Sequence, residues 1–260
     1  MNAIEFKKLK KIYRGKIAAV DGIDLTIPKS TIFGIIGPNG AGKSTIINIL
    51  AGLVNKTKGE VKILGSQIQK GDYEYKRDVG FVLEQPHYIE KLSVVEYLHF
   101  AGTMYEIETV EIEKRTSELI NFLRLKEKEN DWIESYSTGM KKKVSLAAAL
   151  IHQPKILILD EPLEGIDPVS VKQIKDNLRL MVEKGVTVLI SSHNLDSIEK
   201  MCDEVGIIDK GKLVFQAKTK DIHQKINKGI NKEIYHSLED IFVDAIIDDN
   251  DKGNNKLSWL

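Results

Sequence analysis

A glycine-rich segment between two apolar stretches has the residue types that bind phosphate. Residues 37–45 read Gly-Pro-Asn-Gly-Ala-Gly-Lys-Ser-Thr and match the pattern G-x-x-x-x-G-K-[ST]. Glycines let the backbone wrap closely, so that N–H groups point at phosphate oxygens, and the following helix adds its positive end. Lys43 can reach the β- and γ-phosphates, and the hydroxyl of Ser44 can bind Mg²⁺. The predicted nucleoside triphosphate site comprises Gly37, Pro38, Asn39, Gly40, Ala41, Gly42, Lys43, Ser44 and Thr45.

Two adjacent carboxylates follow a later apolar run, in which residues 155–161 read Lys-Ile-Leu-Ile-Leu-Asp-Glu. The carboxyl end of a strand in an α/β sheet lies at the edge where the phosphate loop also lies. We expect Asp160 to hold the Mg²⁺ shell through water. Glu161 projects differently and can act as a general base on the attacking water, worth about 10² to 10⁴ in rate. This pair predicts hydrolysis of the bound triphosphate.

Two further polar residues stand at the ends of predicted elements. Asp167 precedes Pro168 and is a good N-cap for the helix that follows. His193 follows an apolar strand over residues 186–191. We expect this strand to lie beside the carboxylate strand, so that His193 faces the γ-phosphate. There it could orient the water or sense phosphate through a hydrogen bond.

The pattern of apolar residues predicts alternating strands and helices. Strands are expected at residues 4–9, 18–27, 31–36, 60–64, 79–83, 156–159, 186–191 and 205–208. Helices are expected at residues 43–50, 92–123, 140–151 and 168–184. Short buried strands that alternate with helices predict an α/β fold with a mostly parallel sheet covered on both faces. A helical block near residues 85–150 interrupts this alternation as an insertion, and the last dozen residues are expected to fray.

Composition limits the classes of protein that fit. The 260 residues are 42% hydrophobic and 29% charged, which is typical of a globular chain, and 38 basic residues balance 38 acidic ones. Zero net charge disfavours a nucleic-acid binder, and the run Lys141–Lys143 is interpreted as the solvated start of a helix. The single cysteine, Cys202, excludes an internal disulfide and is expected to be buried. With no 18-residue apolar run and no signal peptide, a membrane role is expected only through a partner.

Residues 136–140, Tyr-Ser-Thr-Gly-Met, resemble the Leu-Ser-Gly-Gly-Gln signature of ATP-binding cassette (ABC) proteins. The phosphate loop, Asp160-Glu161, Gly165-Ile166-Asp167 and His193 occur in the order of that family, and the resemblance covers about residues 2–218. The sequence is most similar to ATPase subunits of bacterial ABC exporters whose permease is a separate chain. The signature departs from the family pattern at Tyr136, Thr138 and Met140 but keeps Ser137 and Gly139.

The resemblance implies the P-loop NTPase (RecA-like) form of the α/β fold. It implies an ABC ATPase domain over residues 2–218 with an N-terminal antiparallel β subdomain and an inserted helical subdomain at about 85–150. Residues 219–260 would form a C-terminal extension, partly frayed.

Further site residues are assigned through the resemblance. Tyr13 matches the aromatic residue that stacks on adenine. Ser137 and Gly139 match residues that contact the γ-phosphate on the opposite subunit, and Asp167 matches the residue that links the two sites across the dimer. The family's glutamine loop should follow the strand at 79–83. Counted from Gly80-Phe81 its position falls on Glu84, with Gln85 one step later, and either side chain could approach Mg²⁺ and the water. We count Glu84 with Ser44 and Asp160 as candidate Mg²⁺ ligands.

The resemblance also implies a function. ATP and Mg²⁺ are the expected cofactors, and the expected partners are a second ATPase copy in a homodimer and a separate transmembrane permease. The chain would lie on the cytoplasmic face of the membrane and power export, with cargo unspecified. The alternative is a non-transport ABC ATPase acting on ribosomes, DNA or a cytosolic assembly. A single cassette, no coiled-coil insertion and zero net charge disfavour it. A GTPase or small kinase is disfavoured by the signature and the lack of an Asn-Lys-x-Asp motif.

Overall fold

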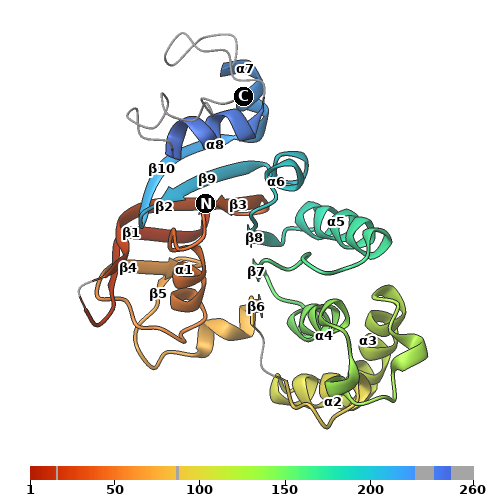
Figure 1. Ribbon diagram of the computed structural model, residues 1–260. Coiled ribbons are helices and arrows are strands. Elements are labelled where there is room, and N and C mark those ends of the chain that lie inside the picture. Colours follow the sequence, from red (N-terminus) through yellow and green to blue (C-terminus); the bar gives the residue numbers. More distant parts are fainter. Residues whose placement is uncertain (16, 86–87, 226–236, 247–260) are drawn as a thin grey trace.

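The computed structural model describes residues 1–15, 17–85, 88–225 and 237–246, and they form two sheets with helices around them (Figure 1). The larger sheet has the strand order β10-β9-β3-β8-β7-β6, and all of its neighbouring pairs are parallel except β9 with β10. Its strands are β3 (Ile32–Ile36), β6 (Val79–Val82), β7 (Ile156–Asp160), β8 (Thr187–Ser191), β9 (Glu204–Asp209) and β10 (Lys212–Lys218). The smaller, antiparallel sheet has the order β2-β1-β4-β5 and contains β1 (Asn2–Ile12), β2 (Ala18–Pro28), β4 (Lys58–Ile63) and β5 (Ser66–Gln67). The α/β fold class predicted from the sequence is confirmed.

The helices lie on both faces of the larger sheet (Figure 1). On one side are α1 (Lys43–Leu50) and the antiparallel sheet, and on the other are α4 (Thr138–Leu150), α5 (Pro168–Glu183) and α6 (Leu195–Met201). The helical block adds α2 (Val94–Met104), α3 (Thr109–Phe122) and the 3-10 turns η2 (Lys126–Lys128) and η3 (Ile133–Ser135). Another 3-10 turn, η1 (Glu74–Asp78), precedes β6, while α7 (Thr219–Lys225) and α8 (Leu238–Ile246) follow β10.

The central strands of the larger sheet, β3, β7 and β8, are buried along their whole length, so both of their faces are covered. In β3, Ile32 and Ile36 belong to the core under α4, α5 and α6. Phe33 and Ile35 belong to the core under α1 and the antiparallel sheet. This burial on both faces explains why the sequence of β3, in the middle of the sheet, is entirely apolar.

The described helices α2, α4, α5 and α6 begin at side-chain caps, which fix their first residues. Ser93 and Glu96 form a capping box at α2, in which each side chain bonds the other's backbone N–H. Ser137 caps α4, and Asp167 caps α5 ahead of Pro168. The predicted N-cap at Asp167 is confirmed.

The remaining differences from the sequence expectations have local causes. The helical stretch predicted at residues 92–123 breaks in two, because Glu106 has a positive φ of 59° between α2 and α3. The sequence did not predict β10 or α6; α6 has only seven residues, and the faces of β10 alternate between partly buried and exposed. The dozen residues expected to fray fall outside the described residues. Upstream of them, Leu238 and Ile241 of α8 are buried, and α8 lies against α6 and β9.

Across the described ranges, no helix is long and apolar enough to cross a membrane.

Candidate active site

The phosphate loop connects β3 to α1 and depends on close backbone packing. Gly42 has a φ of 111°, and a Cβ at this position would lie 2.3 Å from the carbonyl oxygen of Ala19. A Cβ on Gly37 would lie 2.2 Å from the carbonyl oxygen of Ile208. Side chains at either position would force the backbone apart, so both glycines are required by sterics, and Gly42 is also required by its positive φ. The loop is held between β2, which contains Ala19, and β9, which contains Ile208.

Lys43 is folded over this loop. Its side chain is almost fully buried, and its Nζ donates to the carbonyl oxygens of Gly37 at 2.7 Å and Pro38 at 3.1 Å. Burial lowers the pKa of Lys43, and the nearby charges of Glu161, Asp160 and Glu84 oppose that shift. The ammonium group thus lies close to three carboxylates, at the first turn of α1.

Asp160 is the last residue of β7 and is 2% exposed. It stands opposite Ser191 in the parallel pair of β7 and β8, and the Ser191 hydroxyl donates to its Oδ1. Burial raises the pKa of Asp160, whereas hydrogen bonds from Ser191 and Ser44 act in the opposite direction. The predicted placement of this carboxylate at the sheet edge, beside the phosphate loop, matches the observed geometry.

Glu161 begins the loop after β7 with a φ of 46°, which is unusual for a residue with a Cβ. Its N–H lies 3.3 Å from the carbonyl oxygen and 3.2 Å from the Oγ of Ser191. Its Oε2 lies 3.0 Å from Nδ1 of His193, so the two side chains meet as their positions at neighbouring strand ends predict. The carboxylate is largely buried, while the imidazole is mostly exposed.

Glu84 and Gln85, the two candidates for the glutamine-loop position, differ in their surroundings. The Oγ of Ser44 donates to Oε2 of Glu84 at 3.3 Å, and Glu84 lines the cavity beside the phosphate loop. Gln85 is exposed and is not among the described residues that line this cavity. Which of the two serves the reaction stays a prediction.

These side chains surround a cavity of about 300 Å³. Its lining consists of Ala19, Asn39, Gly40, Ala41, Gly42, Lys43, Ser44, Thr45, Glu84 and Glu161. The hydroxyl of Ser44 and the carboxylates of Glu84 and Asp160 are the oxygen donors that Mg²⁺ prefers. Within the described ranges, no cluster of three or more His, Cys, Asp or Glu side chains could hold a metal alone. The donor set therefore fits an ion that completes its shell with water and phosphate oxygens.

The signature residues lie elsewhere. Ser137 is exposed and accepts a hydrogen bond from the Met140 N–H at 3.3 Å. Gly139 is buried so tightly that a Cβ would lie 2.2 Å from the carbonyl oxygen of Gly165. Neither residue is among the described residues that line the phosphate-loop cavity. Of the two, only Ser137 is exposed at the start of α4.

Tyr13 and Asp167, which were also assigned through the resemblance, each contact a lysine. Tyr13 follows β1 and is 40% exposed, with Nζ of Lys11 4.8 Å from its ring centroid. Asp167 accepts from the Ser170 N–H at 2.9 Å and pairs with Nζ of Lys143 at 2.9 Å. These contacts, the Ser170 backbone hydrogen bond first, hold the pKa of the Asp167 carboxyl well below its usual range.

The interpretation of Lys141–Lys143 as a solvated run is wrong for two of the three lysines. Lys142 is 5% exposed and Lys143 is 7% exposed. Lys143 pairs with Asp167, and Nζ of Lys142 bonds Oε2 of Glu164 at 3.1 Å and the carbonyl oxygen of Glu161 at 2.7 Å. Both stems lie against the loop after β7, which supplies the oxygens that permit burial of their charges. Glu164 itself is mostly exposed.

Comparisons with known proteins agree with this geometry. The sequence profile of the family described as ABC transporter matches residues 20–164. The linearmycin resistance ATP-binding protein LnrL of Bacillus subtilis (strain 168) is 38% identical over 211 residues, which cover 81% of this chain and 68% of that protein. The lantibiotic transport ATP-binding protein SrtF of Streptococcus pyogenes is 33% identical, covering 89% of this chain and 97% of that protein.

Solved structures show the same fold. The ATP-binding subunit of an ABC transporter superposes with a TM-score of 0.84 at 28% identity, covering 94% of this chain and 99% of its own. The dimeric, post-hydrolysis cassette MJ0796 bound to ADP and Pi superposes with a TM-score of 0.76 at 26% identity, covering 83% of this chain and 98% of its own. The chain therefore belongs to the ABC transporter family, as one of its ATP-binding, P-loop ATPase subunits.

Proposed function

We propose that this chain hydrolyses Mg·ATP in a head-to-tail pair with a second copy and transmits the cycle to a separate membrane permease that exports its cargo. The observation that carries the proposal is the convergence of one buried lysine and three carboxylates on the phosphate-loop cavity. Lys43, Glu84 and Glu161 line that cavity, and Asp160 is close enough to oppose the pKa shift of Lys43.

The proposed roles follow from position. The N–H groups of the loop and Lys43 would hold the β- and γ-phosphates, and Ser44, Asp160 and Glu84 would hold Mg²⁺. Bound Mg²⁺ would neutralise charge that develops on the phosphate oxygens. Glu161 would take a proton from the water whose oxygen attacks the γ-phosphorus. The bond between the γ-phosphorus and the β,γ-bridging oxygen breaks, so that ADP leaves and inorganic phosphate forms.

His193 would orient this base and contact the γ-phosphate, because its Nδ1 lies 3.0 Å from the Glu161 carboxylate. Tyr13 would stack on adenine. Base–aromatic stacking contributes about 1–3 kcal/mol and discriminates little between bases.

The position of the signature residues supports the proposed second copy. Ser137 is exposed at the start of α4, away from its own cavity, whereas an anion is best held by donors at a helix N-terminus. A two-fold pair would place Ser137 and the Gly139 N–H of each chain against the γ-phosphate of the other, forming both sites at once. Asp167, which caps the next helix and bonds α4 through Lys143, would link the two sites.

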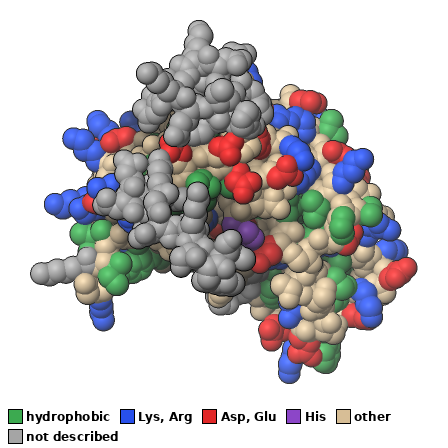
Figure 2. Space-filling model, turned by 45° about the horizontal axis from the view of Figure 1, so that its top comes forward, with side chains coloured by type: hydrophobic (Ala, Val, Ile, Leu, Met, Phe, Trp, Pro, Cys, Tyr) green, Lys and Arg blue, Asp and Glu red, His purple; other side chains and the backbone are tan. Residues whose placement is uncertain are grey.

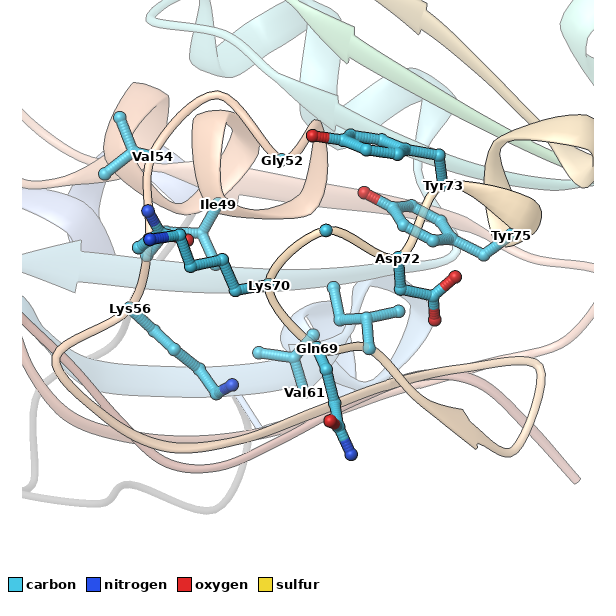
Figure 3. Close-up of a pocket in the computed structure, with 13 residues that line it drawn as sticks. Ile49, Gly52, Val54, Lys56, Val61, Gln69, Lys70, Asp72, Tyr73 and Tyr75 are labelled. Atoms are coloured by element: carbon cyan, nitrogen blue, oxygen red, sulfur yellow. The ribbon is translucent and has the colours of Figure 1, made fainter.

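An apolar surface supports a membrane partner. Exposed apolar side chains occur near the C-terminal end of α1, on the loop before η1 and along α2; they are Leu53, Tyr73, Phe100 and Met104. Two contacts bring these segments together: Arg77 pairs with Glu106 at 3.0 Å, and the Tyr75 hydroxyl donates to the Leu50 carbonyl at 2.7 Å. Figure 3 shows the rings of Tyr73 and Tyr75 on the same side of a small pocket next to Gly52. We propose that the permease contacts this surface from the cytoplasmic face of the membrane.

The export direction is proposed from relatives. The names of LnrL and of the daunorubicin/doxorubicin resistance ATP-binding protein DrrA of Streptomyces peucetius refer to drug resistance, and that of SrtF refers to lantibiotic transport. DrrA is 31% identical over 237 residues. Resistance fits removal of a compound from the cell.

The alternative, a cassette acting on ribosomes or DNA, would favour a basic surface. The formal net charge is zero, and Figure 2 shows acidic and basic side chains interspersed over the described part of the face it displays. Affinity purification of the full chain from detergent-solubilised membranes tests the choice. We expect a multi-span membrane protein to co-purify stoichiometrically, whereas ribosomal proteins or DNA in its place would contradict the proposal.

The register of the glutamine loop gives a second test. We expect Glu84→Ala to lower coupled ATP hydrolysis more than Gln85→Ala, because Oε2 of Glu84 accepts from Ser44 at 3.3 Å. The measurement is the steady-state rate of both variants with Mg·ATP, with nucleotide binding as the control for folding. A larger loss in Gln85→Ala would mean that the loop is shifted by one residue.

A further inference from the structure

Lys142 is a buried lysine with two protein acceptors. It lies in the second turn of α4, five residues after the cap Ser137, and is 5% exposed. A buried ammonium group is costly unless its hydrogens are bonded. Its Nζ donates to the carbonyl oxygen of Glu161 at 2.7 Å and to Oε2 of Glu164 at 3.1 Å. Since Glu164 is mostly exposed, the shorter bond to the Glu161 carbonyl is the better shielded of the two.

The peptide that accepts this bond is strained. Glu161 has a φ of 46°, a conformation that costs a non-glycine residue free energy and persists only where its surroundings enforce it. On the N–H side, Ser191 provides its carbonyl oxygen at 3.3 Å and its hydroxyl at 3.2 Å. On the carbonyl side, the acceptor is held by Lys142. Residue 161 is thus fixed from β8 and from α4 at once.

We propose that Lys142 is a positioning residue for hydrolysis: its ammonium group fixes the strained peptide of Glu161, so that the carboxylate stays against His193 and faces the phosphate-loop cavity. Ser137 is the N-cap of α4, so the same hydrogen bond joins the helix that begins with the signature residues to Glu161, the proposed general base of the chain's own site. A partner's nucleotide that moves the start of α4 would therefore shift Glu161. This inference rests on the proposed role of Glu161 as the base.

The neighbouring lysine provides a structural comparison. Lys143 lies on the same helix with similar burial, but its Nζ bonds Oδ2 of Asp167 at 2.9 Å. Lys142 is therefore the residue of this run that joins α4 to Glu161. Lys141 is less buried and serves as a matched control on the adjacent position.

The test is ATP hydrolysis by the full-length chain carrying Lys142→Met, which keeps the stem and removes the ammonium group. Misplacement of a catalytic group can lower the rate up to about 100-fold, so we expect kcat to fall about 10- to 100-fold. The KM for ATP should change by less than about twofold, since the loop that binds the triphosphate is untouched. Lys142→Arg should recover most of the rate, while Lys141→Met and Glu164→Gln should behave as wild type. A wild-type kcat in Lys142→Met, or losses as large in Glu164→Gln, would overturn the proposal.

A second measurement separates positioning from a folding defect. In a Glu161→Gln background, Lys142→Met should cause little further loss in single-turnover hydrolysis, because the group it positions has already been removed. A full additional loss would show that Lys142 acts by another route and would overturn the inference. A wild-type rate in Glu161→Gln alone would instead overturn the proposed function.

Discussion

Replacing Lys43 with alanine should nearly abolish ATP binding. The buried ammonium group of Lys43 now bonds the carbonyl oxygens of Gly37 and Pro38, at 2.7 and 3.1 Å, beside the cavity. Charge-assisted hydrogen bonds contribute about 1.5–3 kcal/mol each, and Lys43 would make them to both the β- and γ-phosphates. The loss in affinity should therefore be about 100-fold or more. Removal of Lys43 also takes away a cation that interacts with Glu161, Asp160 and Glu84, so the three carboxylates would repel the triphosphate more strongly.

The measurement is the Kd for Mg·ATP by calorimetry or fluorescence, on protein shown to be folded. Lys76→Ala is the control: burial lowers the pKa of this partly buried lysine as it does that of Lys43, but Lys76 lies near Tyr73, away from the phosphate loop. We expect the control to bind ATP as the wild type does. Equal affinity in Lys43→Ala and wild type would be incompatible with the phosphate-loop assignment.

Replacing Glu161 with glutamine should stop hydrolysis while keeping ATP bound. Glutamine has the size of glutamate but cannot accept the proton, so the rate should fall about 10² to 10⁴-fold. The backbone bonds of residue 161 to Ser191 and Lys142 do not involve the carboxylate and should survive the change. ATP would then continue to bridge two copies through Ser137, and the pair should persist.

Size-exclusion chromatography of this variant with Mg·ATP measures the second effect. A dimer is expected with Mg·ATP and a monomer with ADP, since only ATP carries the γ-phosphate that the signature contacts. Glu164→Gln is the control, because it removes a nearby carboxylate that is mostly exposed. This variant should hydrolyse ATP and elute as the wild type does. The proposal of a site shared between two copies would be contradicted if the variant stayed monomeric with ATP bound, and if the permease complex also held only one copy of it.

The part of the site that lies in contiguous motifs was predictable from the sequence. The phosphate loop, Asp160 and Glu161 were placed correctly because each follows an apolar strand, and parallel strands end at a common edge. The contact between His193 and Glu161 follows from the same rule, since β7 and β8 are neighbours.

Contacts that join separate elements were not predictable. Three consecutive lysines are typical of a solvated helix, yet Lys142 and Lys143 are buried against a loop about twenty residues further on. Nothing in the pattern of apolar residues marks the acceptors at Glu161, Glu164 and Asp167. The positive φ of Glu161 was also not predictable, because glycine is the usual sequence signal for such a conformation and residue 161 is a glutamate.

The most direct test of a site shared between two copies mixes two inactive variants. Lys43→Ala damages the phosphate loop, and Ser137→Asp puts a negative charge where the partner's γ-phosphate would lie while keeping an N-cap side chain at α4. In a head-to-tail pair of one copy of each, both defects fall in one site and the other site is intact. Equal mixing should therefore restore about a quarter of the wild-type sites, and hydrolysis in proportion. A mixture no faster than the two variants measured separately would contradict a site shared between two chains.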